Sequence, residues 1–143
     1  MWLLVGLGLA ALGFALLAGG RQERIYVAAK AASTVGDLAI ASHPPGDSVG
    51  HQAIIDLALL AVVLPLALKS TKVWPLAAAS LCVAALMTEA AQTLVHAAPQ
   101  AYGIAKGVWE LLADIVVAVG AWNAWRARRR GADRAPQRTA DPA

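Results

Sequence analysis

Acidic, amide and imidazole side chains at helical spacings are the residues of this sequence best suited to chemistry. Glu89, Gln92 and His96 follow at i, i+3 and i+7, and Glu110 precedes Asp114 by four positions. Side chains at these spacings share one face of a helix. Both groups lie in or at the end of long apolar runs, where an ionisable residue is a candidate functional residue. The pattern therefore predicts two polar stripes on two helices.

Two further residues complete the predicted site. His51 lies just before an apolar run, and Lys106 falls on the Glu110 side of its helix, where it can pair with a carboxylate. Asp37 and Asp56 are expected to join helices by hydrogen bonds more than to bind a ligand, and Lys30 to extend its ammonium toward the cytoplasm. We expect a ligand-binding pocket formed by His51, Glu89, Gln92, His96, Lys106, Glu110 and Asp114.

Neither a metal site nor a cofactor is predicted. The histidines and carboxylates match no metal-binding spacing such as His-Glu-x-x-His. The one cysteine, Cys82, lies in an apolar run, so we expect a small buried side chain rather than a metal ligand or half of a disulfide.

The composition excludes an ordinary soluble domain. Of the 143 residues, 59% are hydrophobic and 15% are charged, with a mean hydropathy of +0.58. A soluble domain carries about 25% charged residues and an apolar share of roughly 45–50%. The basic residues gather at the ends of apolar runs and in the last 18 residues, without interleaved aromatic residues. This distribution favours membrane topology over a nucleic-acid surface, so no nucleic-acid partner is expected.

Apolar runs near the roughly 20 residues that cross a bilayer as a helix predict the fold class. We expect an all-α, polytopic transmembrane helical bundle with five spans, at residues 2–18, 25–42, 53–68, 73–95 and 104–125. These spans make residues 1–125 a single transmembrane helical domain, followed at 126–143 by a basic, disordered cytoplasmic tail. Glycines at 6, 8, 13, 103 and 107 are expected to allow close helix packing.

Basic residues predict the orientation of the spans. The arginines after Trp125 place the carboxyl terminus in the cytoplasm, because short basic flanks stay inside. Arg21 and Arg24 then also lie inside only if residues 25–42 cross the membrane. We therefore favour five spans with the amino terminus outside, with four spans as the alternative. In this topology the predicted pocket lies in the outer half of the bilayer.

Three short motifs together resemble the VanZ-like family, small membrane proteins named for teicoplanin resistance. The family pattern is Asp-Lys-x-x-His, then Glu-x-x-Gln, then Asp-x-x-x-Asn followed by glycines. The corresponding residues over about 47–125 are Asp47 to His51, Glu89 with Gln92, and Glu110 with Asp114 and Gly120. Ser48 replaces the family's lysine, while Glu110 and Asp114 replace its aspartate and asparagine. The resemblance implies action on envelope lipids or lipid-bearing antibiotics at the outer face.

A second similarity is discounted. Ser48 to His51, with His96 downstream, is similar to elements of membrane lipid-phosphate phosphatases of the phosphatidic acid phosphatase type. Thr88-Glu89 and Gln100 stand where that family has its arginine region and its aspartate. Carboxylates would repel a phosphate, so this activity is not expected.

These features predict a small, multi-pass protein of a bacterial-type inner membrane that binds, or acts on, an envelope lipid or lipid-like amphiphile. The excess of carboxylates favours a ligand with amines or hydroxyls, or one held through a divalent cation. The alternative is a non-catalytic small subunit or assembly factor of a larger membrane complex, or a homo-oligomer. No set of residues specifies a reaction, so a binding role is favoured over an enzymatic one.

Overall fold

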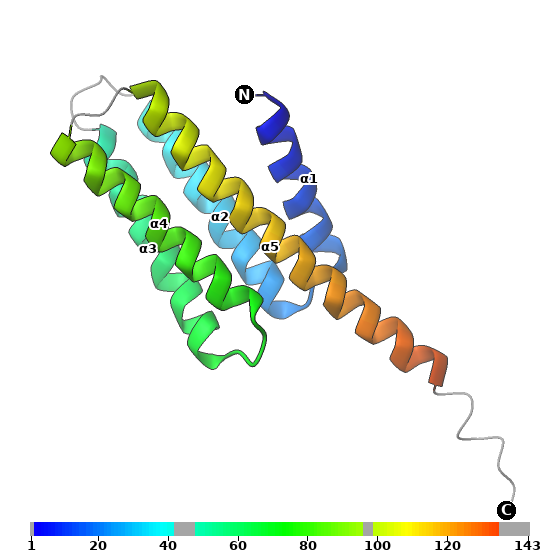
Figure 1. The fold of residues 1–143 in the computed structure, drawn as a ribbon. Helices are drawn as coiled ribbons and strands as arrows, with labels where there is room; N and C mark the ends of the chain where they lie inside the picture. Colours follow the sequence, from blue (N-terminus) through cyan, green and yellow to red (C-terminus); the bar gives the residue numbers. More distant parts are fainter. Residues whose placement is uncertain (1, 42–47, 96–98, 135–143) are drawn as a thin grey trace, which may run out of the picture.

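The chain forms a bundle of α-helices that lie side by side in the computed structural model (Figure 1). The structure describes residues 2–41, 48–95 and 99–134, and these ranges contain five helices and no strand. The helices are α1 (Trp2–Ala18), α2 (Arg21–Ala41), α3 (Ser48–Lys69), α4 (Trp74–Val95) and α5 (Pro99–Arg134). The all-α prediction is confirmed.

The helices form a closed ring in sequence order. Each packs against the next along the chain, α5 also packs against α1, and α5 touches α2 across the ring. Helix α1 begins at the end of the bundle where α2 ends and α5 begins, and α5 projects beyond the opposite end (Figure 1). Polar residues on the inner faces of α2, α3, α4 and α5 are thereby directed toward one another.

Two helices of the described part of the chain are long and apolar enough to cross a membrane. The qualifying stretches are Gly50–Lys69 of α3 and Trp74–Leu94 of α4. The apolar stretch of α1, Gly6–Ala18, is shorter, and α2 contains five charged residues in its 21. Length and composition thus identify two candidate spans among the five helices.

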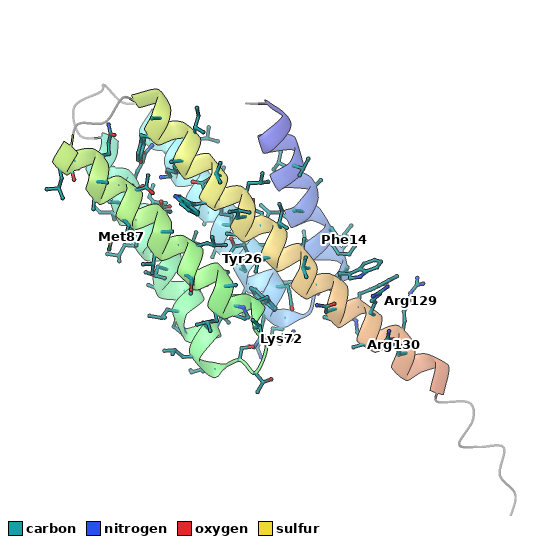
Figure 2. The ribbon with its side chains drawn as sticks, viewed as in Figure 1. Phe14, Tyr26, Lys72, Met87, Arg129 and Arg130 are labelled. Atoms are coloured by element: carbon teal, nitrogen blue, oxygen red, sulfur yellow. The ribbon has the colours of Figure 1, made fainter. Side chains whose placement is uncertain are left out.

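Large apolar side chains lie on the outside of the bundle, and several charged side chains lie inside it. Large apolar side chains are exposed on all five helices, among them Leu17, Leu38, Leu68, Leu94 and Ile104. Figure 2 shows Met87 on the outer side of α4 and Tyr26 between the helices. Six charged side chains, of types that soluble proteins mostly keep exposed, are buried. They are Glu23, Lys30, Asp56, Glu89, Lys106 and Asp114.

The apolar part of the core depends on small residues, which let the helices approach closely. Ala78, Ala79 and Ala121 are buried there, and Cys82 is buried as expected. At Gly120 an added Cβ would lie 2.5 Å from Cδ1 of Trp74, so only glycine fits at this crossing of α4 and α5.

The prediction of close packing at other glycines is largely wrong within the chain. Gly8 does approach Asp114, whose Oδ2 would lie 3.0 Å from an added Cβ. At the four remaining positions, Gly6, Gly13, Gly103 and Gly107, an added Cβ would meet none of the described residues within 4 Å. Spacing alone predicts a small face but not the side of the helix that a neighbour covers.

A buried carboxylate joins the first two helices to the α3–α4 turn. Glu23 is fully buried, and its Oε2 accepts the Gly20 N–H at 2.9 Å, the return half of a capping box at the start of α2. Its Oε1 accepts from Lys72 Nζ at 2.8 Å and from Trp74 Nε1 at 3.1 Å. Glu23 therefore caps α2 and fixes the position of the next helical hairpin.

The expected disordered tail requires correction. Helix α5 continues through Arg134, so residues 126–134 are helical, while 135–143 lie outside the described residues. Alanine and arginine favour the helix, and the guanidinium groups of Arg126 and Arg129 lie over the rings of Trp122 and Trp125. These cation–π contacts extend the helix beyond the bundle.

Glu23 provides a test of this junction. Burial by itself would raise the pKa of Glu23, but the hydrogen bond and charge of Lys72 and the Gly20 N–H hold the pKa below its usual 4.5. We expect Glu23→Gln to lower the free energy of unfolding by about 1–3 kcal/mol at neutral pH, because a hydrogen-bonded charge is lost. Thermal unfolding in detergent, followed by tryptophan fluorescence, measures this difference.

The same variant predicts a pH dependence. Because the folded-state pKa of Glu23 is lowered, its stabilising contribution is complete above about pH 4.5 and is lost as the pH falls through the lowered value. The difference in Tm between wild type and Glu23→Gln should therefore shrink as the pH falls below 4.5. A difference that stays constant with pH would contradict the ion pair.

Candidate functional site

The centre of the polar core is the ammonium group of Lys106. Its Nζ lies 2.8 Å from Glu89 Oε1 and 3.1 Å from Asp56 Oδ2. The side chains of Lys106, Asp56 and Glu89 are 11%, 6% and 2% exposed, so the three charges are shielded from solvent. These residues come from α5, α3 and α4, and one lysine therefore ties three helices together. Lys106 thus pairs with carboxylates, but with Asp56 and Glu89 rather than with Glu110, on whose side of the helix it was expected.

Two uncharged residues extend this cluster toward the end where α5 begins. The Tyr102 hydroxyl donates toward Gln52 Oε1 at 3.1 Å and lies 3.4 Å from Glu89 Oε1. Tyr102 precedes Lys106 by one helical turn, as Gln52 precedes Asp56. Stripes from α3 and α5 thus enclose Glu89 of α4 from two sides.

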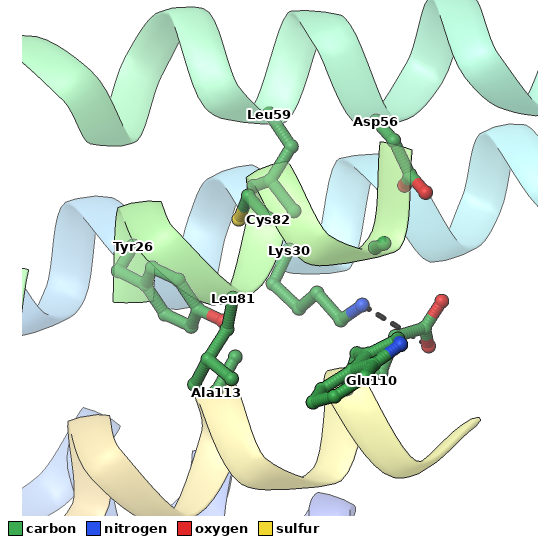
Figure 3. Close-up of a pocket in the computed structure, with 10 residues that line it drawn as sticks. Tyr26, Lys30, Asp56, Leu59, Leu81, Cys82, Glu110 and Ala113 are labelled. Carbon is green, nitrogen blue, oxygen red and sulfur yellow. Dashed lines mark ion pairs between the residues drawn. The ribbon is translucent and has the colours of Figure 1, made fainter. Parts of the chain in front are cut away.

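A second buried lysine continues the network across the ring. Lys30 Nζ of α2 lies 3.2 Å from Glu110 Oε2 of α5, and Figure 3 shows this ion pair between the two helices. The prediction that Lys30 extends toward the cytoplasm is wrong, because its side chain is 7% exposed and turned into the bundle. A nearby carboxylate stabilises the Lys30 ammonium better than extension of the side chain along the apolar surface toward the cytoplasm would.

A small cavity lies beside this second ion pair. Lys30, Asp56 and Glu110 provide its charged groups, and the remaining lining residues are Tyr26, Leu59, Leu81, Cys82, Ala85, Trp109 and Ala113 (Figure 3). The cavity has a volume of about 20 Å³, which is enough for one water molecule but not for a lipid head group. Glu110, 32% exposed, connects the cavity to the surface.

Several buried polar atoms have unused hydrogen-bonding capacity. Within the described ranges, Asp37 Oδ1, Glu89 Oε2 and the Ser33 hydroxyl have no hydrogen-bond partner, while the Tyr26 hydroxyl and the Asp114 carboxylate lie against each other. Such atoms are uncommon in native interiors, since each costs about 1–3 kcal/mol. The unpartnered atoms belong to α2 and α4, so the core can accept or donate further hydrogen bonds.

The structure brings only part of the predicted site together. Glu89 and Lys106 are in direct contact, whereas Glu110 pairs with Lys30 instead and alone of the predicted set lines the cavity. Asp114 is buried farther along α5, where it approaches Gly8. The described predicted residues thus form a chain of contacts along the core rather than one open pocket.

The remaining predicted residues are peripheral or not described. Gln92 is half-buried, one turn beyond Glu89 on α4. His51 is exposed at the start of α3, and His96 lies outside the described residues. No group of three histidine, cysteine or acidic side chains in the described ranges is arranged to hold a metal ion.

Sequence reasoning missed Gln52, Tyr102 and the pairing role of Asp56. A signal for them exists, because Gln52 and Asp56 are four apart, and so are Tyr102, Lys106, Glu110 and Asp114 in succession. Spacing by four keeps such side chains on one helical face. An uninterrupted polar stripe of this length marks the inner face of α5.

Comparison with models of known protein families, with curated proteins and with solved structures finds no match to this chain. The resemblance to the VanZ-like family thus stays a prediction that rests on the residues themselves.

Removal of Lys106 tests whether its ion pairs support the fold. We expect Lys106→Met to destabilise the protein by about 3–5 kcal/mol, because two buried carboxyl groups lose their cation. The change should appear as a lower Tm in detergent.

Neutralising the partners supplies the control. The triple variant Lys106→Met, Asp56→Asn, Glu89→Gln should recover much of the lost stability, since it leaves no unpaired buried charge. A triple variant at least as unstable as Lys106→Met would contradict this explanation.

Proposed function

We propose that this chain is a five-span protein of a bacterial-type inner membrane, with its amino terminus outside and its carboxyl terminus in the cytoplasm. The exposed leucines, valines and isoleucines on every helix support this location, because a lipid environment, unlike water, favours such a surface. The ion-paired interior supports it as well, since charged groups within membranes face the inside of the bundle.

Contacts at one end of the bundle favour five spans over four. Ser70 donates to Gln22 Oε1 at 3.3 Å, and Lys72 binds Glu23. The α1–α2 and α3–α4 turns therefore lie at the same end of the bundle. If α3 crosses the bilayer, α2 crosses it too, and Arg21 and Arg24 then lie on the cytoplasmic side as basic flanks should.

Cysteine labelling distinguishes the two topologies. In a Cys82→Ala background, we expect Arg21→Cys and Thr71→Cys to react with a membrane-impermeant maleimide only after cells are permeabilised. Both positions are exposed in the structure, so the reagent can reach them once inside. Labelling of Arg21→Cys in intact cells, with Thr71→Cys still protected, would favour four spans.

The proposed activity is binding of an envelope lipid or lipid-like amphiphile through its polar head group, as the resemblance to VanZ-like proteins implies. The observation that carries it is the surplus of acidic groups in the bundle. Five carboxyl groups, at 37, 56, 89, 110 and 114, accompany two lysines, at 30 and 106. After the two lysines are paired, acidic groups remain without a cationic partner. An amine- or hydroxyl-bearing ligand would supply the missing charge or hydrogen bonds.

Glu110 is the point at which such a ligand would engage the network. Its carboxylate is partly exposed and already binds one ammonium group, that of Lys30. A ligand amine at the surface would share this carboxylate, and its hydroxyls would reach the free oxygen of Asp37 or Glu89 only if the small cavity widened. Binding is thus expected to shift the Lys30–Glu110 pair.

Native mass spectrometry of the full chain with phosphatidylethanolamine, phosphatidylcholine or a glycopeptide antibiotic tests this proposal. We expect the amine-bearing lipid or the glycopeptide to bind, and Glu110→Gln to weaken binding about tenfold, the loss of one charge-assisted hydrogen bond. Glu89→Gln should weaken it as well. Glu23→Gln is the matched control, because it removes a carboxylate from the other end of the bundle.

Glu110→Gln and Glu89→Gln variants that bind as tightly as wild type would overturn the pocket. The alternative, a small subunit or assembly factor, is favoured by the open glycines Gly6 and Gly13 of α1, which none of the described residues covers. A stoichiometric partner that co-purifies with wild type and is lost when Gly6 or Gly13 is enlarged would support that role instead.

A further inference from the structure

A basic groove lies at the end of the bundle where α1 turns into α2, far along the helices from the carboxylate network. Its lining residues are Gly19, Gly20, Arg21, Arg24, Ile25, Ala28 and Arg128. It is a shallow hollow of about 460 Å³ that is largely open to the surroundings. The lining combines three guanidinium groups with a glycine turn and a short apolar surface.

Two helices supply the arginines. Arg21 and Arg24 are exposed on the first turn of α2, where the positive end of the helix dipole adds to their charge. Arg128 comes from the projecting part of α5 and donates a hydrogen bond to the carbonyl of Ala18, the last residue of α1. A guanidinium has five N–H donors, so Arg128 is held in place with donors to spare.

The nearest described carboxylate does not neutralise this groove. Glu23 lies between Arg21 and Arg24 in the sequence, but its side chain is fully buried and bound to Gly20, Lys72 and Trp74. Among the described residues, no acidic side chain lines the groove. The groove therefore carries positive charge without an internal counterion.

Apolar side chains continue the groove along α2 toward the middle of the bundle. Ile25 follows Arg21, and Ala28 follows Arg24, each by four positions, so all four share one helical face. Ile25 is 37% exposed and Ala28 is exposed as well. A ligand with a phosphate above and a hydrocarbon chain below fits this order, whereas a free phosphate would leave the apolar part unused.

We propose that Arg21, Arg24 and Arg128 bind the phosphate of an anionic phospholipid at the cytoplasmic end of the bundle. Guanidinium groups bind phosphate oxygens with two parallel hydrogen bonds, and basic pockets between membrane helices suit lipid head groups. The bound lipid would join α5 to the α1–α2 turn. This site rests on the membrane location proposed above and is independent of the carboxylate network.

Native mass spectrometry of the purified full chain in mild detergent, with phosphatidylglycerol and phosphatidylcholine as probes, tests the site. We expect wild type to bind phosphatidylglycerol in preference to phosphatidylcholine. Replacement of Arg21, Arg24 and Arg128 by Gln should weaken phosphatidylglycerol binding at least tenfold. The matched control replaces Arg126, Arg129 and Arg130 by Gln, which removes the same charge outside the groove and should change binding less than about twofold.

Several outcomes would overturn the site. Equal weakening in both triple variants would assign binding to net charge, and unchanged binding in the groove variant would exclude the groove. Displacement of the lipid by millimolar inorganic phosphate would identify a soluble phosphate ligand instead. If the groove triple variant fails to fold, Arg21→Gln with Arg24→Gln, which keeps the Arg128–Ala18 contact, is compared with Arg126→Gln and Arg130→Gln. Cysteine labelling tests the membrane location separately.

Discussion

A lysine ammonium is stable inside an apolar helical bundle only where oxygen atoms surround it, because an unpaired buried charge costs several kcal/mol. Lys30 and Lys106 both meet this condition, and their partners come from other helices. The two ammonium groups thus connect α2, α3, α4 and α5. Sliding one helix by a turn would separate these pairs, so the charges fix the register of the bundle.

The need to pair buried charges also bears on the ligand-binding role proposed for the interior. A core with equal numbers of carboxylates and lysines would be neutral and complete. This core holds additional carboxyl groups, among them Asp37, whose Oδ1 lacks a partner within the described residues, and Asp114, which lies against the Tyr26 hydroxyl. Retaining such groups is costly, and a cationic or hydroxyl-bearing ligand would offset that cost. The small cavity beside Glu110 is a gap in the packing next to these groups.

The two ends of the bundle differ in chemistry, which gives the molecule a direction. One end contains the carboxylate network with Tyr102 and Gln52, and the other contains the Glu23 junction and the arginine groove. In the proposed topology, the arginines lie at the cytoplasmic leaflet, and the acidic groups lie nearer the outer leaflet. The proposed orientation and the proposed phospholipid site therefore rely on the same arginines.

The sequence alone determined the five helical segments, because hydrophobicity and helical spacing are local properties. It also identified Glu89, Lys106, Glu110 and Asp114 as unusual, since a charge in an apolar run is visible without a fold. The tertiary structure decided which groups pair. Lysine side chains are long and flexible, so the partner of Lys30 depends on where α5 lies rather than on the sequence of α2.

The tertiary structure also determined the role of residues that depend on contact with a neighbouring helix. Glu23 is buried because the α3–α4 turn covers it, and Gly120 proved to be the close contact rather than Gly6 or Gly13. The helical extension through residue 134 followed from stacking of arginine on tryptophan. Sequence determines what each helix can offer, and packing determines which faces meet, because long-range contacts set the rotation of each helix about its axis.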